Sequence, residues 1–381
     1  MGIVLIGGIS CNSQSPSPAT EDEFYFGADL SYVNQVQDQG GTYRNESGET
    51  TDPFELFARH GINLARFRLW HQPTWTQTVY GTSGSQQYSD LQDVTRSMRR
   101  ASDQGMATLL DLHYSDFWAD PGRQQIPAAW NAITEISVLA DSVRDYTRNT
   151  LWSLQKEGLT PTFIQLGNEI NCGMLFTDRS PEFPNCNVCE GNWAHLGILI
   201  NAAIDAVRSV DQGIGIMLHV ADPVNVNWWY ENIMGSGNVT DFEYIGISYY
   251  PLWHTDLSYE TIGSNIESFR DRFEKEVMIV ETAYPWTTAD ADGYGNILGG
   301  RPLQAFPFSP TGQHDFLTEL TQTLINAGAK GVVYWEPAWV TSDLKDPWGQ
   351  GSSWDNATFF NFDGIAQPAI QFPDFQYVFP E

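Results

Sequence analysis

The chain alternates between short β-type runs and longer segments with helical periodicity, and this alternation limits the folds that it can adopt. The eight expected strands cover residues 24–33, 64–70, 107–114, 163–170, 214–222, 244–252, 277–285 and 331–339. Strands that are joined through helices pair in parallel, and eight strand–helix units close on themselves. The sequence therefore predicts an α/β fold, a (β/α)8 barrel of the TIM type.

Glycine residues follow several of the expected helices. Gly61, Gly105 and Gly158 each stand after a segment with apolar residues at helical spacing. Glycine is favoured there because it adopts the left-handed conformation that ends a helix without strain. These positions indicate where a helix ends and the next strand approaches.

The beginning of the chain differs in composition from the rest. Residues 1–11 contain a short apolar run that ends near Cys11, and residues 12–23 form a polar Ser/Pro-rich linker. The first segment resembles the end of a bacterial lipoprotein signal, truncated before its basic residues, with Cys11 as the lipidated residue. The apolar run is too short to span a bilayer. We expect a secreted protein or an outer-surface lipoprotein, with residues 24–381 forming the single barrel domain.

The composition is strongly acidic, which excludes two classes of partner. The chain has 47 acidic and 19 basic residues, and its net charge of −28 repels nucleic acids and anionic membranes. Only 4 of the basic residues are Lys. An acidic, Lys-poor surface suits high salt, where self-repulsion is screened, so a saline habitat is one hypothesis and an ordinary acidic secreted protein is the other. No oligomer interface is evident, and we expect a monomer.

Polar and aromatic side chains gather where the expected strands end. They are Arg66, Arg68, Asp111, His113, Asn168, Glu169, His219, Asp222, Tyr249, Tyr250, Glu281, Trp335 and Glu336. A barrel presents these strand ends on one face, where active sites lie. Any one of these residues could simply tie loops together, but burying so many polar groups without a task would be costly.

Two of these residues, Glu169 and Glu281, are expected to face each other across the barrel mouth because they end the fourth and the seventh strand. Cleavage of a glycosidic bond needs two carboxyl groups, one to protonate the leaving oxygen and one to attack the anomeric carbon or to activate water. Each glutamate alone could equally be an ion-pair partner. The pair at opposite strand ends favours the catalytic interpretation.

The neighbours of the two glutamates fit the same chemistry. Asn168 can bond a sugar hydroxyl, and Trp335 can form the floor under the attacked sugar. Either Tyr249 or Tyr250 can donate a hydrogen bond to Glu281. Arg68 can keep Glu281 ionised, because a nearby cation lowers the pKa of a carboxyl group. Glu169 must stay protonated to act as an acid, so we expect its pKa to be raised.

Longer stretches of the chain resemble glycoside hydrolase family 53, the endo-β-1,4-galactanases. These stretches are FGADLSYV (26–33), RFRLWHQP (66–73), LLDLHYSDFWADPGRQQIPAAW (109–130), QLGNEIN (165–171), GISYYPLWH (246–254) and IVETAYPW (279–286). The segment DFWADPG at 116–122 is the most distinctive. The resemblance extends from about Phe24 to the end of the chain.

The resemblance implies a retaining enzyme that cuts internal β-1,4-galactosyl bonds in galactan or in the type I arabinogalactan side chains of pectin. It implies Glu169 as acid/base and Glu281 as nucleophile. The residues that it implies as sugar contacts or support are Arg68, His113, Asp116, Trp118, Asn168, Tyr249, Trp253 and Trp335. A retaining mechanism predicts the two carboxyl groups about 5–5.5 Å apart.

An acidic loop follows the seventh expected strand and suggests a metal site. Asp290, Asp292, Tyr294 and Asn296 alternate in a loop that contains glycine, and oxygen ligands in such a loop suit Ca2+. The resemblance implies a structural calcium site here, completed by Ser352 and Asp355. Where bacterial members have His, this chain has Tyr294, so only a backbone carbonyl ligand would survive the change. The alternative is a solvated acidic turn, and no organic cofactor is expected.

Three cysteines, Cys172, Cys186 and Cys189, lie close together in the sequence. In an exported protein one disulfide is expected among them, and the sequence leaves the pair open. A zinc site is an alternative, but no fourth ligand is evident.

Two other functions compete with galactan hydrolysis. A related barrel glycanase that acts on mannan, xylan or β-glucan would share the catalytic residues, and only the segment at 116–122 argues against it. A surface lipoprotein that binds glycans without cutting them would fit the acidic surface and the aromatic residues. Such a protein would have no use for both Glu169 and Glu281.

Overall fold

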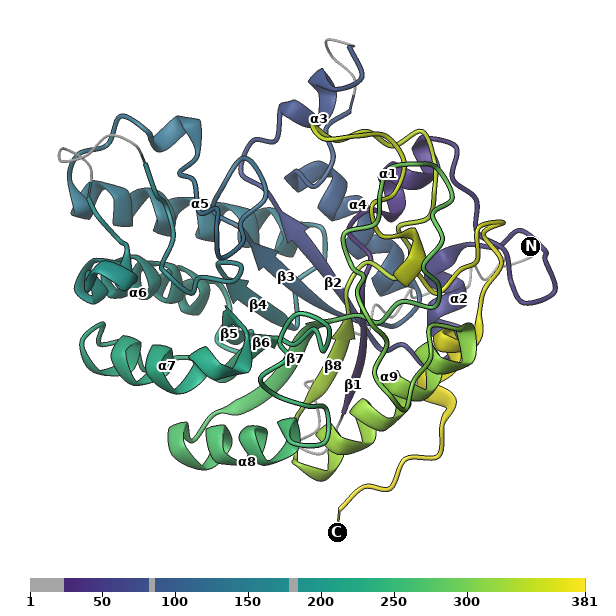
Figure 1. Cartoon of the computed structure of the whole chain (residues 1–381). Coiled ribbons are helices and arrows are strands. Elements are labelled where there is room, and N and C mark those ends of the chain that lie inside the picture. The colour runs from purple at the N-terminus through teal and green to yellow at the C-terminus, as the bar shows by residue number, and fades with distance from the viewer. Residues whose placement is uncertain (1–23, 82–85, 178–183, 381) are drawn as a thin grey trace, which may run out of the picture.

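The computed structural model describes residues 24–81, 86–177 and 184–380, and its centre is a closed barrel of eight parallel strands (Figure 1). The strands pair in chain order, and the eighth pairs with the first. They are β1 (Tyr25–Asp29), β2 (Leu64–Leu69), β3 (Ala107–Leu112), β4 (Phe163–Leu166), β5 (Gly215–Ala221), β6 (Tyr244–Ser248), β7 (Glu276–Thr282) and β8 (Gly331–Tyr334). The predicted α/β barrel is confirmed.

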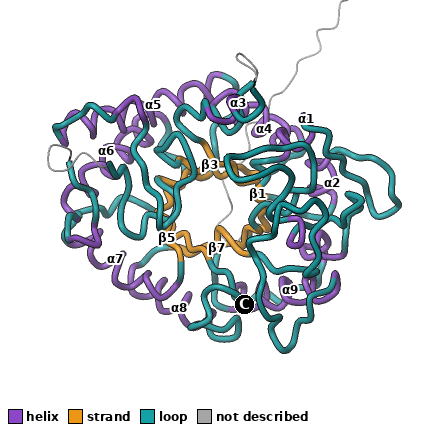
Figure 2. The backbone as a smooth tube through the Cα atoms, turned by 45° about the horizontal axis from the view of Figure 1, so that its top comes forward, coloured by secondary structure: helices purple, strands orange, loops and turns teal. Residues whose placement is uncertain are grey.

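Helices surround the strands in an outer ring (Figure 2). They are α1 (Val33–Asp38), α2 (Pro53–Arg59), α3 (Trp75–Thr78), α4 (Leu91–Asp103), α5 (Ile136–Lys156), α6 (Trp193–Val210), α7 (Val226–Gly235), α8 (Ile262–Phe273) and α9 (Pro310–Asn326). Gly61, Gly105 and Gly158 follow α2, α4 and α5 with φ of 81°, 75° and 72°. The predicted helix ends are confirmed, because each glycine has the left-handed conformation.

The interior of the barrel changes from apolar to polar along each strand. Side chains alternate between the two faces of a strand, so residues two apart point the same way. Leu64 of β2 and Leu109 of β3 lie in a small apolar cluster. Arg66 and Asp111, two residues further on, form a buried ion pair. Ala65 and Phe67, which flank Arg66 and point to the other face of β2, belong to the larger core instead. The barrel therefore has an apolar base and a polar layer at the carboxyl ends of its strands.

The strands end earlier than the sequence predicts, by one residue in β2 and by up to five in β8. Two of the predicted strands run through residues with left-handed backbone, Glu169 with φ of 47° and Glu336 with φ of 46°. An extended strand cannot continue through such a conformation, which is strained for a non-glycine residue. The predicted strands thus included the first residues of the loops that carry the polar side chains.

The cysteine prediction is resolved by the fold. Cys172 and Cys189 form a disulfide in the segment between β4 and α6, and Cys186 is a buried free thiol. A zinc site of the three cysteines would need two sulfurs that are instead bonded to each other. The expected signal and linker, residues 1–11 and 12–23 with Cys11, lie outside the described residues. Within the described residues, every helix is too short or too polar to cross a membrane.

Candidate active site

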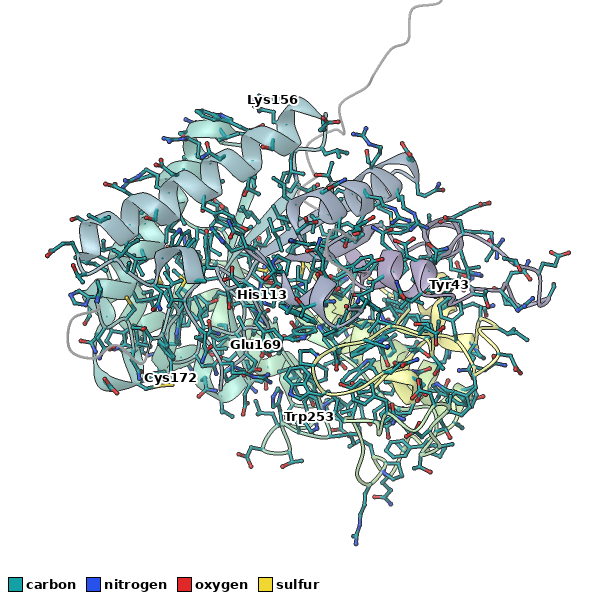
Figure 3. All side chains as sticks on the ribbon, turned by 90° about the horizontal axis from the view of Figure 1, so that it is seen from above. Tyr43, His113, Lys156, Glu169, Cys172 and Trp253 are labelled. Carbon is teal, nitrogen blue, oxygen red and sulfur yellow. A yellow bond between two sulfur atoms is a disulfide. The ribbon has the colours of Figure 1, made fainter. Side chains whose placement is uncertain are left out.

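A cleft of about 520 Å³ opens at the carboxyl ends of the strands. Figure 3 shows Glu169 near the middle of the molecule and Trp253 nearer its edge. The lining contains six tryptophans, which are Trp118, Trp253, Trp335, Trp339, Trp348 and Trp354. Its polar lining includes Asp120, Arg123, Asn168, Glu169, Tyr250, His254, Glu281, Tyr294, Asp346 and Ser353.

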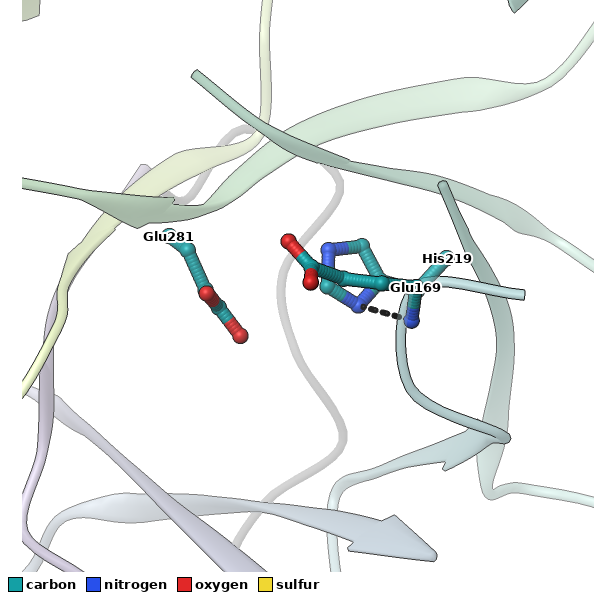
Figure 4. A group of neighbouring side chains, drawn as sticks. All are labelled: Glu169, His219 and Glu281. Carbon is teal, nitrogen blue, oxygen red and sulfur yellow. Dashed lines mark hydrogen bonds between the residues drawn. The ribbon is translucent and has the colours of Figure 1, made fainter. Parts of the chain in front are cut away.

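The carboxylates of Glu169 and Glu281 face each other across this cleft (Figure 4). Glu281 lies in β7, and Glu169 lies three residues beyond β4. One oxygen of Glu169 lies within 4.8 Å of one oxygen of Glu281. So close an approach suits the carboxyl spacing of about 5–5.5 Å that a retaining glycosidase needs, and is short for an inverting pair that must hold a water between them.

Glu281 is held by two groups that favour its charged form. Arg66 contacts Oε1 at 2.9 Å, and the hydroxyl of Tyr250 donates a hydrogen bond of 2.9 Å to Oε2. Burial raises the pKa of Glu281 to about 7, and both contacts oppose this rise. The prediction that Arg68 ionises Glu281 is wrong, because Arg68 pairs with Glu336 instead at 2.5 Å.

Arg66 connects the strands of the polar layer. Its Nη1 bonds Asp29 of β1 at 2.9 Å as well as Glu281, and its Nη2 bonds Asp111 of β3 and Asn168 after β4, each at 2.8 Å. The guanidinium is buried, so these contacts act at low dielectric. Arg66 therefore fixes the positions of residues from three other parts of the barrel relative to Glu281.

Glu169 lies at the end of a chain of hydrogen bonds. Its own backbone N–H donates to Nδ1 of His219 at 3.2 Å, so Nδ1 is an acceptor and Nε2 carries the proton of this neutral ring. Nε2 lies 2.8 Å from Oγ of Ser248, which donates to Oε1 of Glu169 at 2.6 Å. Burial and the Arg66 cation hold the pKa of His219 well below its usual range, which keeps the ring neutral.

The surroundings of Glu169 favour its protonated form. Burial, and next the neighbouring Glu281 carboxylate, hold the pKa of Glu169 well above its usual range, against the smaller effect of the Ser248 hydrogen bond. With Oε1 occupied by Ser248, Oε2 is free to carry the proton. The predicted rise in the pKa of Glu169 agrees with this arrangement.

Asn168 lines the cleft and is fixed from three sides. Its Oδ1 accepts hydrogen bonds from Arg66 at 2.8 Å and from Gln165 at 3.1 Å, and its Nδ2 donates to the carbonyl of Ala119 at 2.8 Å. The second hydrogen of the amide remains for a ligand. The side chain is therefore pre-oriented rather than free to rotate.

The predicted aromatic contacts Trp118, Trp335 and Trp253 all line the cleft. The ring of Trp335 packs edge-on against Trp354, with centroids 4.6 Å apart. Trp118 lies on the guanidinium of Arg68, whose central carbon is 4.3 Å from the ring centroid. Trp253 is 45% exposed, which leaves a ring face open to a ligand.

The other predicted contacts lie behind the cleft wall. Tyr249 is buried and its hydroxyl donates to the carbonyl of Leu257, so the choice between the two tyrosines falls on Tyr250. His113 is buried and bonds Asp111 and the backbone of Ala119. The carboxylate of Asp116 accepts from two backbone N–H groups, those of Gln72 and Ala128. With Arg68 beneath Trp118, these residues support the lining and do not form it.

Three residues of the site have no role in the sequence prediction. Arg66 and Ser248 contact the two glutamates, and Gln165 contacts Asn168 beside Glu169. Of the three, only Arg66 is among the predicted polar strand ends. The sequence does contain a signal for two of them. Arg66 and Arg68 lie two residues apart in β2, and Gln165 lies two residues after the apolar Phe163 in β4, so each is expected to point into the barrel. Which of them reaches Glu281 depends on the stagger of the strands, which the sequence does not contain.

The acidic loop brings together part of its predicted ligand set. Asp290, Asp292 and Asp355 each have a carboxylate oxygen within 4.8 Å of the others. Asn296 donates from Nδ2 to Oδ1 of Asp355 at 2.7 Å, so its amide faces the cluster with nitrogen. The hydroxyl of Ser352 donates to the carbonyl of Trp339.

The side chain of Tyr294 is likewise directed away from the acidic cluster. Its hydroxyl lies 2.7 and 2.6 Å from the two carboxylate oxygens of Asp346. Its backbone N–H donates to Oδ1 of Asp292 at 2.9 Å. Any metal contact from this residue must therefore come from its backbone carbonyl.

Comparison with known proteins places the whole barrel in one group. The model described as Glycosyl hydrolase family 53 matches residues 25–372. The arabinogalactan endo-β-1,4-galactanase of Cellvibrio japonicus (strain Ueda107) is 44% identical over 350 residues, which cover 90% of this chain and 88% of that protein. The endo-β-1,4-galactanase of Bacillus subtilis (strain 168) is 31% identical, over 93% of this chain and 86% of that protein.

A solved structure agrees with these sequence matches. The family 53 catalytic domain from Ignisphaera aggregans superposes with a TM-score of 0.83 at 30% identity, and the match covers 95% of this chain and 99% of that one.

Proposed function

Because the chain belongs to glycosyl hydrolase family 53, we propose that it hydrolyses internal β-1,4-galactosidic bonds in galactan and type I arabinogalactan with retention of configuration. The observation that carries this proposal is the pair of opposed carboxylates in an open, tryptophan-lined cleft. The relatives supply the substrate class, since one is named an arabinogalactan endo-β-1,4-galactanase and the other an endo-β-1,4-galactanase. An open cleft, rather than a closed pocket, suits attack within a polymer.

In the first step Glu281 attacks the anomeric carbon of the bound galactosyl unit. At the same time Glu169 transfers its proton to the glycosidic oxygen, so that the C–O bond breaks and the departing sugar leaves as an alcohol. Arg66 and the hydroxyl of Tyr250 favour the ionised form of Glu281 that this attack requires. The product of the step is a galactosyl ester on Glu281.

In the second step Glu169, now a carboxylate, takes a proton from a water molecule, and the water oxygen attacks the same anomeric carbon. Glu281 departs as a carboxylate, and Glu169 is protonated again. Two inversions give net retention. Ser248 stays bonded to Oε1 in both steps, so the proton passes through Oε2.

The cleft walls suggest how the attacked sugar is held. Trp335 stands beside Glu336 at the end of β8 and presents its ring to the cleft. We assign it as the platform under the attacked galactose. Asn168 is assigned to the sugar hydroxyl next to the anomeric carbon, because its amide is already fixed beside Glu169. Trp118 and Trp253 are assigned to neighbouring sugars.

We also propose that the acidic loop holds a structural Ca2+. Asp290, Asp292 and Asp355 supply a cluster of hard oxygen donors, the ligands that Ca2+ prefers. Burial, and among other causes the charges of the two other aspartates, raises the pKa of Asp355, and a dication would offset this repulsion. These three carboxylates would hold the ion, and Tyr294 would add only its carbonyl. The ion would stabilise the loops and take no part in bond cleavage.

Export from the cytoplasm is the third part of the proposal. The Cys172–Cys189 disulfide supports it, because disulfides form and persist in oxidising compartments. A polymeric plant polysaccharide also has to be cut outside the cell. Mass spectrometry of the membrane fraction for a lipid on Cys11 would distinguish an anchored protein from a freely secreted one.

The test of the main proposal is release of reducing ends from linear galactan, beside mannan, xylan and mixed-linkage β-glucan. We expect release from galactan, and a loss of at least about a thousandfold in Glu281→Gln, because the nucleophile is removed. Glu276→Gln is the matched control, since Glu276 lies in the same strand at the other end of the barrel. Release from another polymer alone would overturn the substrate, and release from none would favour the glycan-binding alternative.

A further inference from the structure

Trp348 is a tryptophan of the cleft lining that remains largely exposed. Its side chain is 54% exposed. Phe117 lies 5.3 Å away between ring centroids, and the guanidinium carbon of Arg123 lies 4.9 Å from the ring. Both neighbours are fixed, since Arg123 pairs with Asp120 and Phe117 packs on Trp75. An exposed indole held in this way is suited to stacking against a sugar ring.

The turn that carries Trp348 is built around Asp346. The buried carboxylate of Asp346 accepts hydrogen bonds of 2.8 Å from the backbone N–H of Trp348 and from that of Gly349. The backbone of Asp346 in turn donates to the carbonyl of Gly349 at 3.1 Å. The direction of the indole therefore depends on where the Asp346 carboxylate is held.

Tyr294, from the acidic loop after β7, holds that carboxylate. Its hydroxyl lies 2.7 and 2.6 Å from the two oxygens of Asp346. Hydrogen bonds to a carboxylate are among the strong ones.

The ring of Tyr294 also fits the same turn by shape. A Cβ atom on Gly349 would lie 2.5 Å from two carbon atoms of this ring, so only glycine leaves room for it. Tyr294 and Asp346 both line the cleft beside Trp348. The ring and hydroxyl together join the loop after β7 to the loop after β8.

We propose that Tyr294 is a positioning residue that favours the binding of long substrates. Through Asp346 it holds Trp348 in place as a stacking platform for a sugar distant from the cleavage point. This inference rests on the proposed galactanase function. It assigns the side chain of Tyr294 to substrate binding and leaves the metal site to the aspartates. Longer chains that reach Trp348 gain affinity from a platform that is already ordered, because no freedom is lost on binding.

The experiment compares kcat/KM for linear galactan with kcat/KM for the shortest galacto-oligosaccharide that the wild type hydrolyses. We expect the ratio to fall about fivefold or more in Tyr294→Phe, which keeps the ring and removes the hydroxyl, through KM rather than kcat. Tyr230→Phe is the matched control, because its buried hydroxyl also donates to one acceptor, the carbonyl of Leu218, away from the cleft. We expect no change in its ratio.

A double-mutant cycle with Trp348→Ala separates positioning from general destabilisation. If Tyr294 acts through Trp348, the double variant has the same ratio as Trp348→Ala alone. Additive losses, an unchanged ratio in Tyr294→Phe, or an equal loss on both substrates would each overturn the inference. Failure of the wild type to cut galactan would instead overturn the proposed function, so the two failures are distinguishable.

Discussion

The hydroxyl of Tyr250 is a specific probe of Glu281, the proposed nucleophile, because among the described residues Glu281 is the carboxylate to which it donates a hydrogen bond. Removing it in Tyr250→Phe takes away a contact that lowers the pKa of Glu281. The pKa of Glu281 then rises further, and the enzyme needs a higher pH to ionise it. We expect the acidic limb of the kcat/KM profile to move to higher pH, and kcat/KM at mildly acidic pH to fall by about 10- to 100-fold.

Tyr249→Phe is the control for this measurement. Tyr249 is the preceding residue, is equally buried, and loses one hydrogen bond to the carbonyl of Leu257. We expect its pH profile to match that of the wild type, although its stability decreases. An acidic limb that moves in both variants, or in neither, would contradict the assignment of Glu281 as the group that must be ionised.

The two tyrosines also show what the sequence could predict at the level of single residues. It placed the pair at the end of β6 but left open which one reaches Glu281. The pairing of β6 with β7 shifts register between Ile247 and Ser248, just before the pair. A register shift of this kind changes which face of the sheet a side chain points to, and the local sequence does not predict where it occurs.

The same physical reason explains the error over the arginines. Arg66 and Arg68 lie on the same face of β2, two residues apart, and both are buried in ion pairs. The one that meets Glu281 is determined by how far β7 is staggered against β2 across the barrel. Residue identity and the two-residue alternation of side chains along a strand were sufficient to predict an arginine near Glu281, the proposed nucleophile. They were not sufficient to predict which of the two arginines it is.

The acidic loop after β7 can be tested as an element. If it holds Ca2+, treatment with a chelator lowers the melting temperature, and added Ca2+ restores it. Ca2+ at about 100 times its dissociation constant stabilises the folded state by about 2.7 kcal/mol. The measurement is a thermal melt at several Ca2+ concentrations, with Mg2+ as the comparison ion, because Mg2+ demands a tighter octahedral geometry.

The variant Asp292→Asn tests whether the effect of Ca2+ on the melting temperature arises at the acidic cluster. Asp292 contributes to the cluster and also accepts from the backbone N–H of Ser352 and from Thr341. We expect the variant to retain the fold but to lose the response to Ca2+. Asp363→Asn, an exposed acidic residue outside the cluster, should respond as the wild type does. Equal melting temperatures of the wild type with and without chelator would remove calcium from the proposal.

At the same scale, the elements differ in how clearly the sequence marks them. All eight strands were found because each is an apolar run with a polar end. Helices α2, α4 and α5 were found with their ends because a glycine follows each. Helix α8 lacks that mark, since Glu274 takes the left-handed position after it with φ of 53°. Glu274 is exposed, and without a glycine at this position the sequence does not mark where the helix ends.

The net charge of the whole molecule leads to a prediction about salt. Nineteen basic residues can neutralise at most 19 of the 47 acidic charges, which leaves a net of 28 negative charges uncompensated. Salt screens this self-repulsion and also weakens the exposed ion pairs, such as Arg96 with Asp38 and Arg99 with Glu157. Exposed pairs contribute at most about 1 kcal/mol each. The repulsion among the unpaired charges acts over the whole surface, so its relief should prevail.

We therefore expect the melting temperature to rise between about 10 mM and 1 M NaCl, most steeply at the low end where the screening length changes from about 30 Å to 10 Å. KCl should give the same curve, since screening depends on ionic strength, whereas sulfate would add stabilisation by exclusion from the surface. The melts are run after chelator treatment, so that the proposed Ca2+ site does not contribute. A melting temperature that stays constant or falls with NaCl would mean that the ion pairs outweigh the repulsion. The acidic, Lys-poor composition would then not support the hypothesis of a saline habitat.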